Sequence, residues 1–300
     1  MEDIINKINR LRKEKNAVIL AHNYQLGEVQ DIADFVGDSL GLSVEASRTS
    51  ADIIVFCGVH FMAETAAILS PSKRVLMPDD NAGCPMADMI TPEDVKRLRS
   101  QHPGAVVVAY VNTSAAVKAE VDYCCTSANA VKVVEKLKDR EIIFVPDKYL
   151  GDYVSSVTGK KLVLFNGYCP THARILPEHI LVAKKEHPSA LVLAHPECRA
   201  EVLKLADKVA STEGMVKFVK ASDAQSFIIA TEVGLLHRLR KENPGKQFYP
   251  ATDVATCPNM KLTTLEKVLW SLEEEKFEIT VPPAIASKAK LAIDRMIQLL

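Results

Sequence analysis

The sequence predicts an α/β fold made of three similar small domains, each with its own parallel sheet, arranged as a pseudo-threefold ring around a central cavity. The first observation behind this prediction is a cysteine–proline pair that recurs after 85 and 88 residues, at Cys84, Cys169 and Cys257. The second is an apolar, strand-like run that recurs after 88 and 85 residues, starting at Ala17, Ala105 and Ala190. Self-similarity of this kind indicates repeated structural units.

The repeat predicts a domain at residues 1–83, a second at 84–168 and a third at 169–257. A helix-like pattern begins seven residues after each cysteine, at Thr91, Leu176 and Thr264. The tail therefore resembles the start of a further unit that the chain does not contain. We expect residues 258–300 to pack on the first domain and to close the ring.

Within the first unit, residues 4–11 carry apolar side chains at helical spacing, and the continuous apolar run 18–20 is typical of a parallel strand covered on both faces. Ser39 stands where a helix N-cap is expected. The remaining pattern predicts helices at 28–35, 40–48 and 61–69 and strands at 53–56 and 75–77.

The later units repeat this order. The second predicts strands at 105–109, 123–125, 141–145 and 161–165 between helices at 92–101, 115–120, 127–138 and 147–157. The third predicts strands at 190–194, 208–210, 226–230 and 247–249 between helices at 177–186, 198–206, 213–219 and 233–241. Strands that alternate with helices indicate parallel sheets with right-handed crossovers.

The composition fits a soluble cytoplasmic enzyme. An apolar content of 48% is ample for a core, and a net charge of −1 gives no reason to expect nucleic acid or an anionic membrane as a partner. The acidic amphipathic start is not a signal peptide, and no apolar run reaches the length of a membrane span. Seven cysteines without a secretory signal predict reduced thiols or metal ligands.

Polar side chains follow the first strand of each unit, and ligands of parallel α/β sheets bind beyond the carboxyl ends of strands. Helix N-termini on the same edge bind carboxylate or phosphate without needing Lys or Arg. A ring would bring these edges to one cavity together with the three cysteines. The strand-end residues are His22, Tyr24, Tyr110, Asn112, His195 and Glu197, and the hydroxyls at helix starts are Ser39, Ser127 and Thr212.

Three converging thiolates leave three interpretations open. A [4Fe–4S] cluster held by three cysteines has one open iron, which acts as a Lewis acid. Zinc is the second, with His172 completing a Cys₃His site. In the third, the cysteines are core residues. The proline after each cysteine favours a ligand loop, because it disfavours helix at the cysteine.

Glu197 directly follows a buried strand, where a carboxylate is costly unless it is paired or reactive. We interpret it as an acid–base group, and the recurring histidines and tyrosines as site residues. The other histidines, and the cysteine pair 124–125, are assigned to turns, surface or packing.

Longer motifs resemble quinolinate synthase essentially from end to end. They are His22-Asn23-Tyr24, Gly37-Asp38-Ser39-Leu40, Phe61-Met62-Ala63-Glu64-Thr65, Tyr110-Val111-Asn112, Thr126-Ser127-Ala128-Asn129 and His195-Pro196-Glu197-Cys198, with the three cysteines. The resemblance implies a three-domain ring around a [4Fe–4S] cluster. It also implies condensation of iminoaspartate with dihydroxyacetone phosphate in NAD biosynthesis, giving quinolinate, phosphate and two waters, with functional coupling to an iminoaspartate-producing enzyme.

Carried over onto this chain, the resemblance makes the three cysteines cluster ligands, with the open iron assisting dehydration. Phosphate and carboxylate groups would be held by Ser39, Asn112, Ser127 and Thr212. Intermediates would be oriented and protons moved by His22, Tyr24, Tyr110, His172 and Glu197, and His195 is expected to bind substrate. The alternatives from other classes are a zinc-dependent hydrolase or aldolase and a cluster-based sensor.

Overall fold

The computed structural model describes residues 2–137 and 139–299. Within them lie three four-stranded sheets, and every strand pairs in parallel with its neighbours. The strand orders are β2-β1-β3-β4, β6-β5-β7-β8 and β10-β9-β11-β12, so the three sheets share one topology. The predicted α/β class with three similar parallel-sheet units is confirmed. Met1, Leu300 and Lys138, at the end of a predicted helix, lie outside the described residues.

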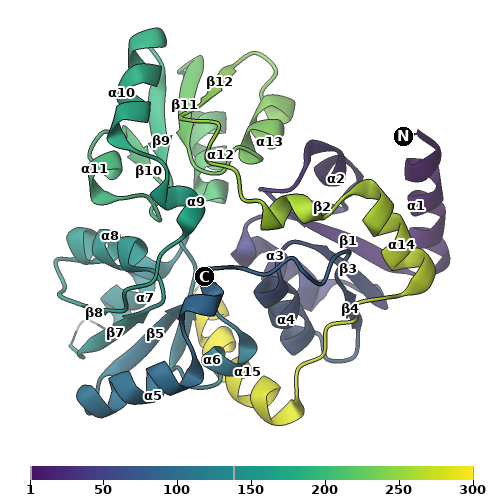
Figure 1. Ribbon diagram of the computed structural model, residues 1–300, viewed down its shortest axis with the longest axis horizontal. Helices are drawn as coiled ribbons and strands as arrows, with labels where there is room; N and C mark the ends of the chain where they lie inside the picture. Colours follow the sequence, from purple (N-terminus) through teal and green to yellow (C-terminus); the bar gives the residue numbers. More distant parts are fainter. Residues whose placement is uncertain (1, 138, 300) are drawn as a thin grey trace.

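In Figure 1 the three sheets and their helices form three lobes around a common centre. The first repeat contains α1 (Glu2–Glu14), β1 (Ala17–His22), α2 (Gly27–Ile32), β2 (Phe35–Gly37), α3 (Ser39–Arg48), β3 (Ile53–Cys57), α4 (His60–Leu69) and β4 (Arg74–Leu76). The second contains η1 (Ala87–Met89), α5 (Pro92–Gln101), β5 (Val106–Tyr110), α6 (Ala115–Lys118), β6 (Tyr123–Cys125), α7 (Ala130–Lys136), β7 (Ile142–Val145), α8 (Lys148–Thr158) and β8 (Val163–Leu164).

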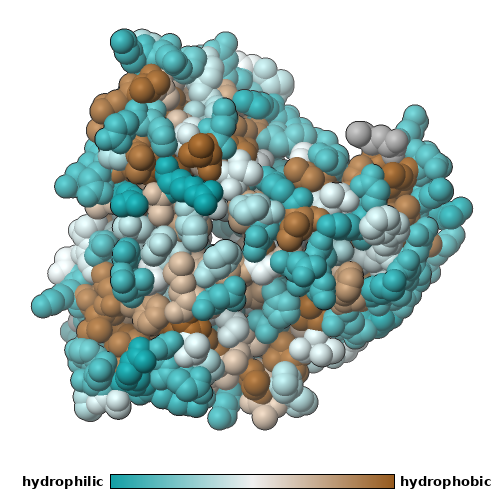
Figure 2. Space-filling model, viewed as in Figure 1, coloured by the Kyte–Doolittle hydropathy of each residue, from teal (hydrophilic) through white to brown (hydrophobic). Residues whose placement is uncertain are grey.

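The third repeat contains α9 (Pro170–Ala173), α10 (Pro177–Glu186), β9 (Leu191–Ala194), α11 (Ala200–Leu203), β10 (Lys208–Val209), α12 (Thr212–Ala221), β11 (Ser226–Ala230), α13 (Leu235–Glu242) and β12 (Gln247–Pro250). The tail forms η2 (Asn259–Leu262), α14 (Leu265–Glu274) and α15 (Pro283–Ile297). No helix within 2–137 and 139–299 is long and apolar enough to cross a bilayer. Hydrophilic side chains cover much of the rim of the face in Figure 2.

Each sheet is fixed by an aspartate that the sequence interpretation did not single out. Asp34, Asp122 and Asp207 each stand 17 residues after the start of the repeated strand. The carboxylate of each accepts a hydrogen bond from the first strand of its sheet, at Ile19 N (2.8 Å), Val107 N (2.8 Å) and Val192 N (2.7 Å). The same hydrogen bond therefore pins the crossover to the central strand in all three units.

The loops that carry the three cysteines contain short helices that the sequence did not predict. A short helix follows each cysteine–proline pair, namely η1, α9 and η2, and Cys169 is the N-cap of α9 with Pro170 at its first turn. Proline is favoured at this position because its missing N–H has no partner in the first turn anyway. The proline thus begins a helical turn and leaves the cysteine at its N-terminal end.

Ser39 is not the N-cap that the sequence predicted. Asp38 takes that position, and its Oδ1 accepts from Gly41 N at 2.8 Å. Ser211 likewise caps the helix that begins at Thr212. A short acidic or hydroxyl side chain one residue earlier reaches the free N–H groups, which leaves the hydroxyls of Ser39 and Thr212 available for other partners.

The tail contacts two repeats. α14 packs against α1 and β3 of the first repeat, whereas α15 contacts α6 and β6 of the second and α4 of the first. Figure 1 shows α15 beside α6. Its buried face belongs to the same apolar cluster as the facing sides of the first two repeats, and comprises Ala289, Ala292, Ile293 and Met296. The boundaries between the domains stay predictions.

Candidate active site

A cavity of about 180 Å³ is lined by residues from all three repeats. Every residue that the sequence placed in the site lines it: His22, Tyr24, Ser39, Cys84, Tyr110, Asn112, Ser127, Cys169, His172, His195, Glu197, Thr212 and Cys257. These side chains from separate repeats therefore share one cavity, and their roles stay predictions.

The three cysteines lie in this cavity as free thiols. Burial raises the pKa of Cys84 to about 12, against the opposing effect of backbone N–H groups of Ala87 and Met86. Burial likewise raises the pKa of Cys169 and of Cys257. A negative charge on one thiolate adds to this effect: Cys257 raises the pKa of Cys84, and Cys84 raises the pKa of Cys169. A bound cation would replace the thiol protons and stabilise the thiolates.

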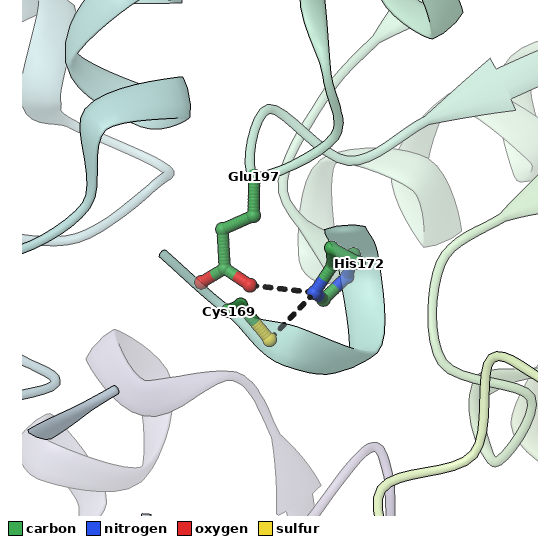
Figure 3. Close-up of side chains that lie close together, drawn as sticks. All are labelled: Cys169, His172 and Glu197. Atoms are coloured by element: carbon green, nitrogen blue, oxygen red, sulfur yellow. Dashed lines mark hydrogen bonds and ion pairs between the residues drawn. The ribbon is translucent and has the colours of Figure 1, made fainter. Parts of the chain in front are cut away.

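Glu197 is the centre of the polar network (Figure 3). Tyr110 Oη donates to its Oε1 at 2.5 Å, and His172 Nδ1 lies 2.7 Å from its Oε2 and 3.2 Å from Cys169 Sγ. Burial opposes ionisation of Glu197, but the neighbouring histidines and the hydrogen bonds from His172 and Tyr110 outweigh burial and lower its pKa. Burial and then Glu197 raise the pKa of Tyr110, so the phenol keeps its proton.

The network continues beyond His172 to Thr231, a residue that the sequence interpretation missed. His172 Nε2 lies 2.8 Å from Thr231 Oγ1, which lies 2.6 Å from Tyr24 Oη. Because a carboxylate only accepts, His172 Nδ1 donates to Glu197. Thr231 Oγ1 links His172 Nε2 to Tyr24 Oη, which gives one continuous hydrogen-bonded path from Tyr24 to Glu197.

His22 and His195 are held in one tautomer by the backbone. His22 Nδ1 accepts from Tyr24 N (3.2 Å), and His195 Nδ1 accepts from Glu197 N (3.3 Å). Burial lowers the pKa of both imidazoles to about 3. Each neutral ring therefore carries its hydrogen on Nε2, and the 3.8 Å separation of His195 and Glu197 is no ion pair. His195 Nε2 donates to Ser127 Oγ at 3.1 Å.

Thr212 has a comparable partner. Asn23 Nδ2 donates to Thr212 Oγ1 at 2.9 Å, and the Oδ1 of Asn23 accepts from Arg238 at 3.0 Å. The hydroxyl oxygen of Thr212 accepts a hydrogen bond from Asn23, and that of Ser127 accepts one from His195. The hydroxyl hydrogens of both residues therefore remain available to a ligand. Hydrogen-bond donors thus face the cavity without any charge at these positions.

Further polar groups line the cavity beside this network. Glu232 is fully buried, accepts from Cys257 N at 3.0 Å and pairs with Lys261 at 2.9 Å. The Oδ1 of Asn112 is buried and has no partner among the described residues. Arg174 follows α9 directly and also lines the cavity.

The ligand atoms of Cys169, His172 and Glu197 lie within 4.8 Å of one another, close enough to hold a metal ion.

Known proteins resemble this chain over nearly its whole length. The family described as Quinolinate synthetase A protein matches residues 6–298. The quinolinate synthase of Dehalococcoides mccartyi (strain CBDB1) is 57% identical over 99% of this chain and 98% of its own. That of Methanosarcina barkeri (strain Fusaro / DSM 804) is 57% identical, with coverages of 98% and 97%. That of Thermodesulfovibrio yellowstonii is 56% identical, with coverages of 99% and 98%.

These matches agree with the motifs that carried the resemblance in the sequence, and they span all three repeats. The chain belongs to the quinolinate synthase family.

Proposed function

We propose that this protein condenses iminoaspartate with dihydroxyacetone phosphate to form quinolinate, phosphate and two waters in NAD biosynthesis. The observation that carries the proposal is the single cavity in which three cysteine thiols face a buried carboxylate network and inward-facing donors. Family membership supports the same reaction. Iminoaspartate and dihydroxyacetone phosphate are both anionic, which matches the donors at Thr212 and Ser127.

A [4Fe–4S] cluster is the cofactor that we propose. The donor set fits it, because three soft thiols from three separate loops line the cavity and each follows the same cysteine–proline pattern. Cys84, Cys169 and Cys257 would hold the cluster, and its open iron would supply Lewis-acid chemistry. An overlapping set of residues favours one second candidate, namely zinc at Cys169, His172 and Glu197, as in a metal-dependent hydrolase or aldolase.

We assign proton transfer to the Glu197 network. The carboxylate is fixed by Tyr110 and His172, so its orientation is set before substrate arrives. It accepts a proton from a carbon or nitrogen of the bound intermediate, and the other proton transfers are assigned to His172 and Tyr24, which Thr231 links to each other.

Substrate groups are assigned to the hydrogen-bond donors that line the cavity. The hydroxyls of Ser39, Ser127 and Thr212 and the Nε2–H groups of His22 and His195 hold carboxylate or phosphate oxygens. Asn112 has an unpaired buried oxygen, which suits an imine or hydroxyl hydrogen of the substrate. We further propose a cytoplasmic enzyme, functionally coupled to a source of iminoaspartate.

The test begins with anaerobic purification of the wild type and of Cys169→Ala, followed by absorption spectra and iron and sulfide assays. We expect a brown wild-type protein with about four irons and four sulfides per chain, a loss of colour in the variant, and quinolinate formation by the wild type alone. A colourless protein with stoichiometric zinc would replace the proposal by the zinc-dependent candidate.

A further inference from the structure

We propose that Arg174 is a substrate-binding residue that captures the phosphate or carboxylate group of the incoming substrate at the mouth of the cavity. The inference rests on the proposed function for the identity of these anions. Neither the repeat nor the family motifs drew attention to Arg174, because the other two repeats carry Met89 and Leu262 five residues after their cysteines.

The backbone of Arg174 is held firmly although its side chain is exposed. Arg174 N donates to Thr171 O at 3.3 Å, and its neighbours Ala173 and Ile175 are buried. The residue stands two positions after His172, on the segment that carries Cys169. Its side chain is exposed and also lines the cavity. This position suits contact with a ligand that enters from solvent.

The acidic side chains that line the cavity would repel an anionic substrate unless a positive charge lies nearby. The lining includes the carboxylates of Asp38, Glu197 and Glu232 in addition to three cysteines. Lys261 pairs with Glu232 at 2.9 Å, but it does not line the cavity. Among the described residues that line the cavity, Arg174 is the only Lys or Arg. An anionic substrate approaching these acids meets one favourable charge, and that charge is Arg174.

Nearby arginines are occupied, whereas Arg174 is not. Arg238 forms ion pairs with Glu213 (2.9 Å) and Glu242 (2.6 Å). Arg199 donates to Ala173 O and lies over the ring of Tyr149 at 5.7 Å. The guanidinium of Arg174 has no hydrogen-bond or ion-pair partner within residues 2–137 and 139–299. Its five N–H donors are therefore free for a ligand.

A guanidinium is well suited to this role. Its planar fork matches two oxygens of a phosphate or carboxylate, and its long stem reaches over neighbouring side chains. The site opens to solvent, which weakens the interaction relative to a buried pair. The expected effect is therefore on the affinity for substrate and its salt dependence, not on the rate of the chemical steps.

The experiment compares Arg174→Met and Arg174→Lys with the wild type, all as cluster-loaded protein. Lys185→Met is the matched control, because Lys185 is an exposed cation of α10 outside the cavity lining. For Arg174→Met we expect the KM for at least one substrate to rise roughly tenfold, as for loss of a charged hydrogen bond, with kcat changed less than about twofold. Arg174→Lys is expected to fall between, and Lys185→Met to match the wild type.

Salt gives a readout that a structural role would not move. The wild-type KM should rise as ionic strength increases, and this dependence should flatten in Arg174→Met because the screened charge is gone. Iron content and absorption spectrum are expected to stay unchanged in every variant.

Equilibrium binding separates this inference from the proposed reaction. Quinolinate and inorganic phosphate serve as probes by calorimetry, whether or not the wild type turns over substrate. Weaker binding to Arg174→Met supports the inference even if no quinolinate is formed, in which case only the proposed function fails. Unchanged binding of both probes, or an unchanged KM and salt dependence in an active enzyme, overturns the role of Arg174.

Discussion

Backbone amides fix the tautomers of His22 and His195 in the cavity. Tyr24 N and Glu197 N each donate to Nδ1 of the histidine two residues before, in equivalent places of the first and third repeats. The hydrogen is thereby confined to Nε2 of His22 and His195. A site can bind anions through such neutral donors because their orientation is fixed in advance.

Asn23 offers an isosteric test of this polarity. In Asn23→Asp the carboxylate can only accept, so the Thr212 hydroxyl would turn its hydrogen away from the cavity. Arg238 remains as partner of the new carboxylate. We expect the KM for substrate to rise by about tenfold, equivalent to roughly 1.4 kcal/mol, with a nearly unchanged unfolding midpoint. A normal KM in a well-folded variant would contradict the assigned direction of this hydrogen bond.

The histidines also predict how stability depends on pH. Burial lowers the pKa of His22 to about 3, below its ordinary value of 6.5, so the unfolded chain binds the proton more readily. The stabilisation is fully present above pH 6.5 and is lost as the pH falls toward 3. Urea unfolding of cluster-free protein should show a midpoint that falls over this window. The fall should be shallower in His22→Gln, and an equally steep fall would count against a buried neutral imidazole.

The sequence predicted most of the residues that line the cavity, but it did not predict their hydrogen-bond and ion-pair partners. Equal offsets from three strand starts located His22, Ser127 and Thr212, because a repeat transfers position from one unit to the next. Glu232 escaped because its partner Lys261 lies 29 residues away, in the tail. Thr231 escaped because a threonine after a strand is ordinary in any sequence.

At the scale of elements, the repeat also includes residues with a structural role, namely Asp34, Asp122 and Asp207, whose carboxylates bind the central strand of each sheet. None of them lines the cavity. Each stands close to the second strand of its sheet and accepts a hydrogen bond from a buried backbone amide of the first strand. The same crossover is therefore held by the same hydrogen bond in all three repeats.

Asp207→Ala would leave Val192 N without its acceptor in a buried strand. We expect a loss of about 1–3 kcal/mol in the free energy of unfolding, the usual cost of an unsatisfied buried amide. Asp223→Ala is the control, since Asp223 is exposed and its side chain has no hydrogen-bond or ion-pair partner within the described ranges. Denaturant unfolding measures both variants. Equal stabilities would show that the Asp207 hydrogen bond is replaced by water.

Element ends were the least predictable feature. The sequence placed residue 35 in a helix, but α2 ends at Ile32 and Phe35 begins β2. The short helical turn that begins at Pro170 was not predicted, although Cys169 itself is extended, as the following proline favours. The error at residue 35 arises because an apolar residue at the end of a helix and one at the start of a strand look alike in the sequence.

At the scale of the whole molecule, the plan of three similar parallel-sheet units followed from the repeat. The placement of α15 did not, because amphipathic spacing predicts a buried face without naming the surface that covers it. The second repeat accepts α15 over α6 and β6, where α6 has only four residues.

Adjacent residues of α15 provide a matched pair. Ala292 is 1% exposed and Leu291 is 58% exposed. Ala292→Asp would bury an unpaired charge between the first two repeats, and we expect a loss of more than about 3 kcal/mol in the free energy of unfolding. Leu291→Asp is expected to stay within about 0.5 kcal/mol of the wild type. If the two variants unfold alike, α15 does not join these repeats as described.

The position of α15 has a consequence for how the protein is made. The first two repeats share one apolar core with residues near the end of the chain, including Ile293 and Met296. During synthesis these two repeats emerge from the ribosome long before α15, so their common core stays incomplete while the whole third repeat is translated. Completion of this shared core therefore waits for α15, and a nascent chain stalled after the second repeat would expose apolar side chains that α15 covers in the folded protein.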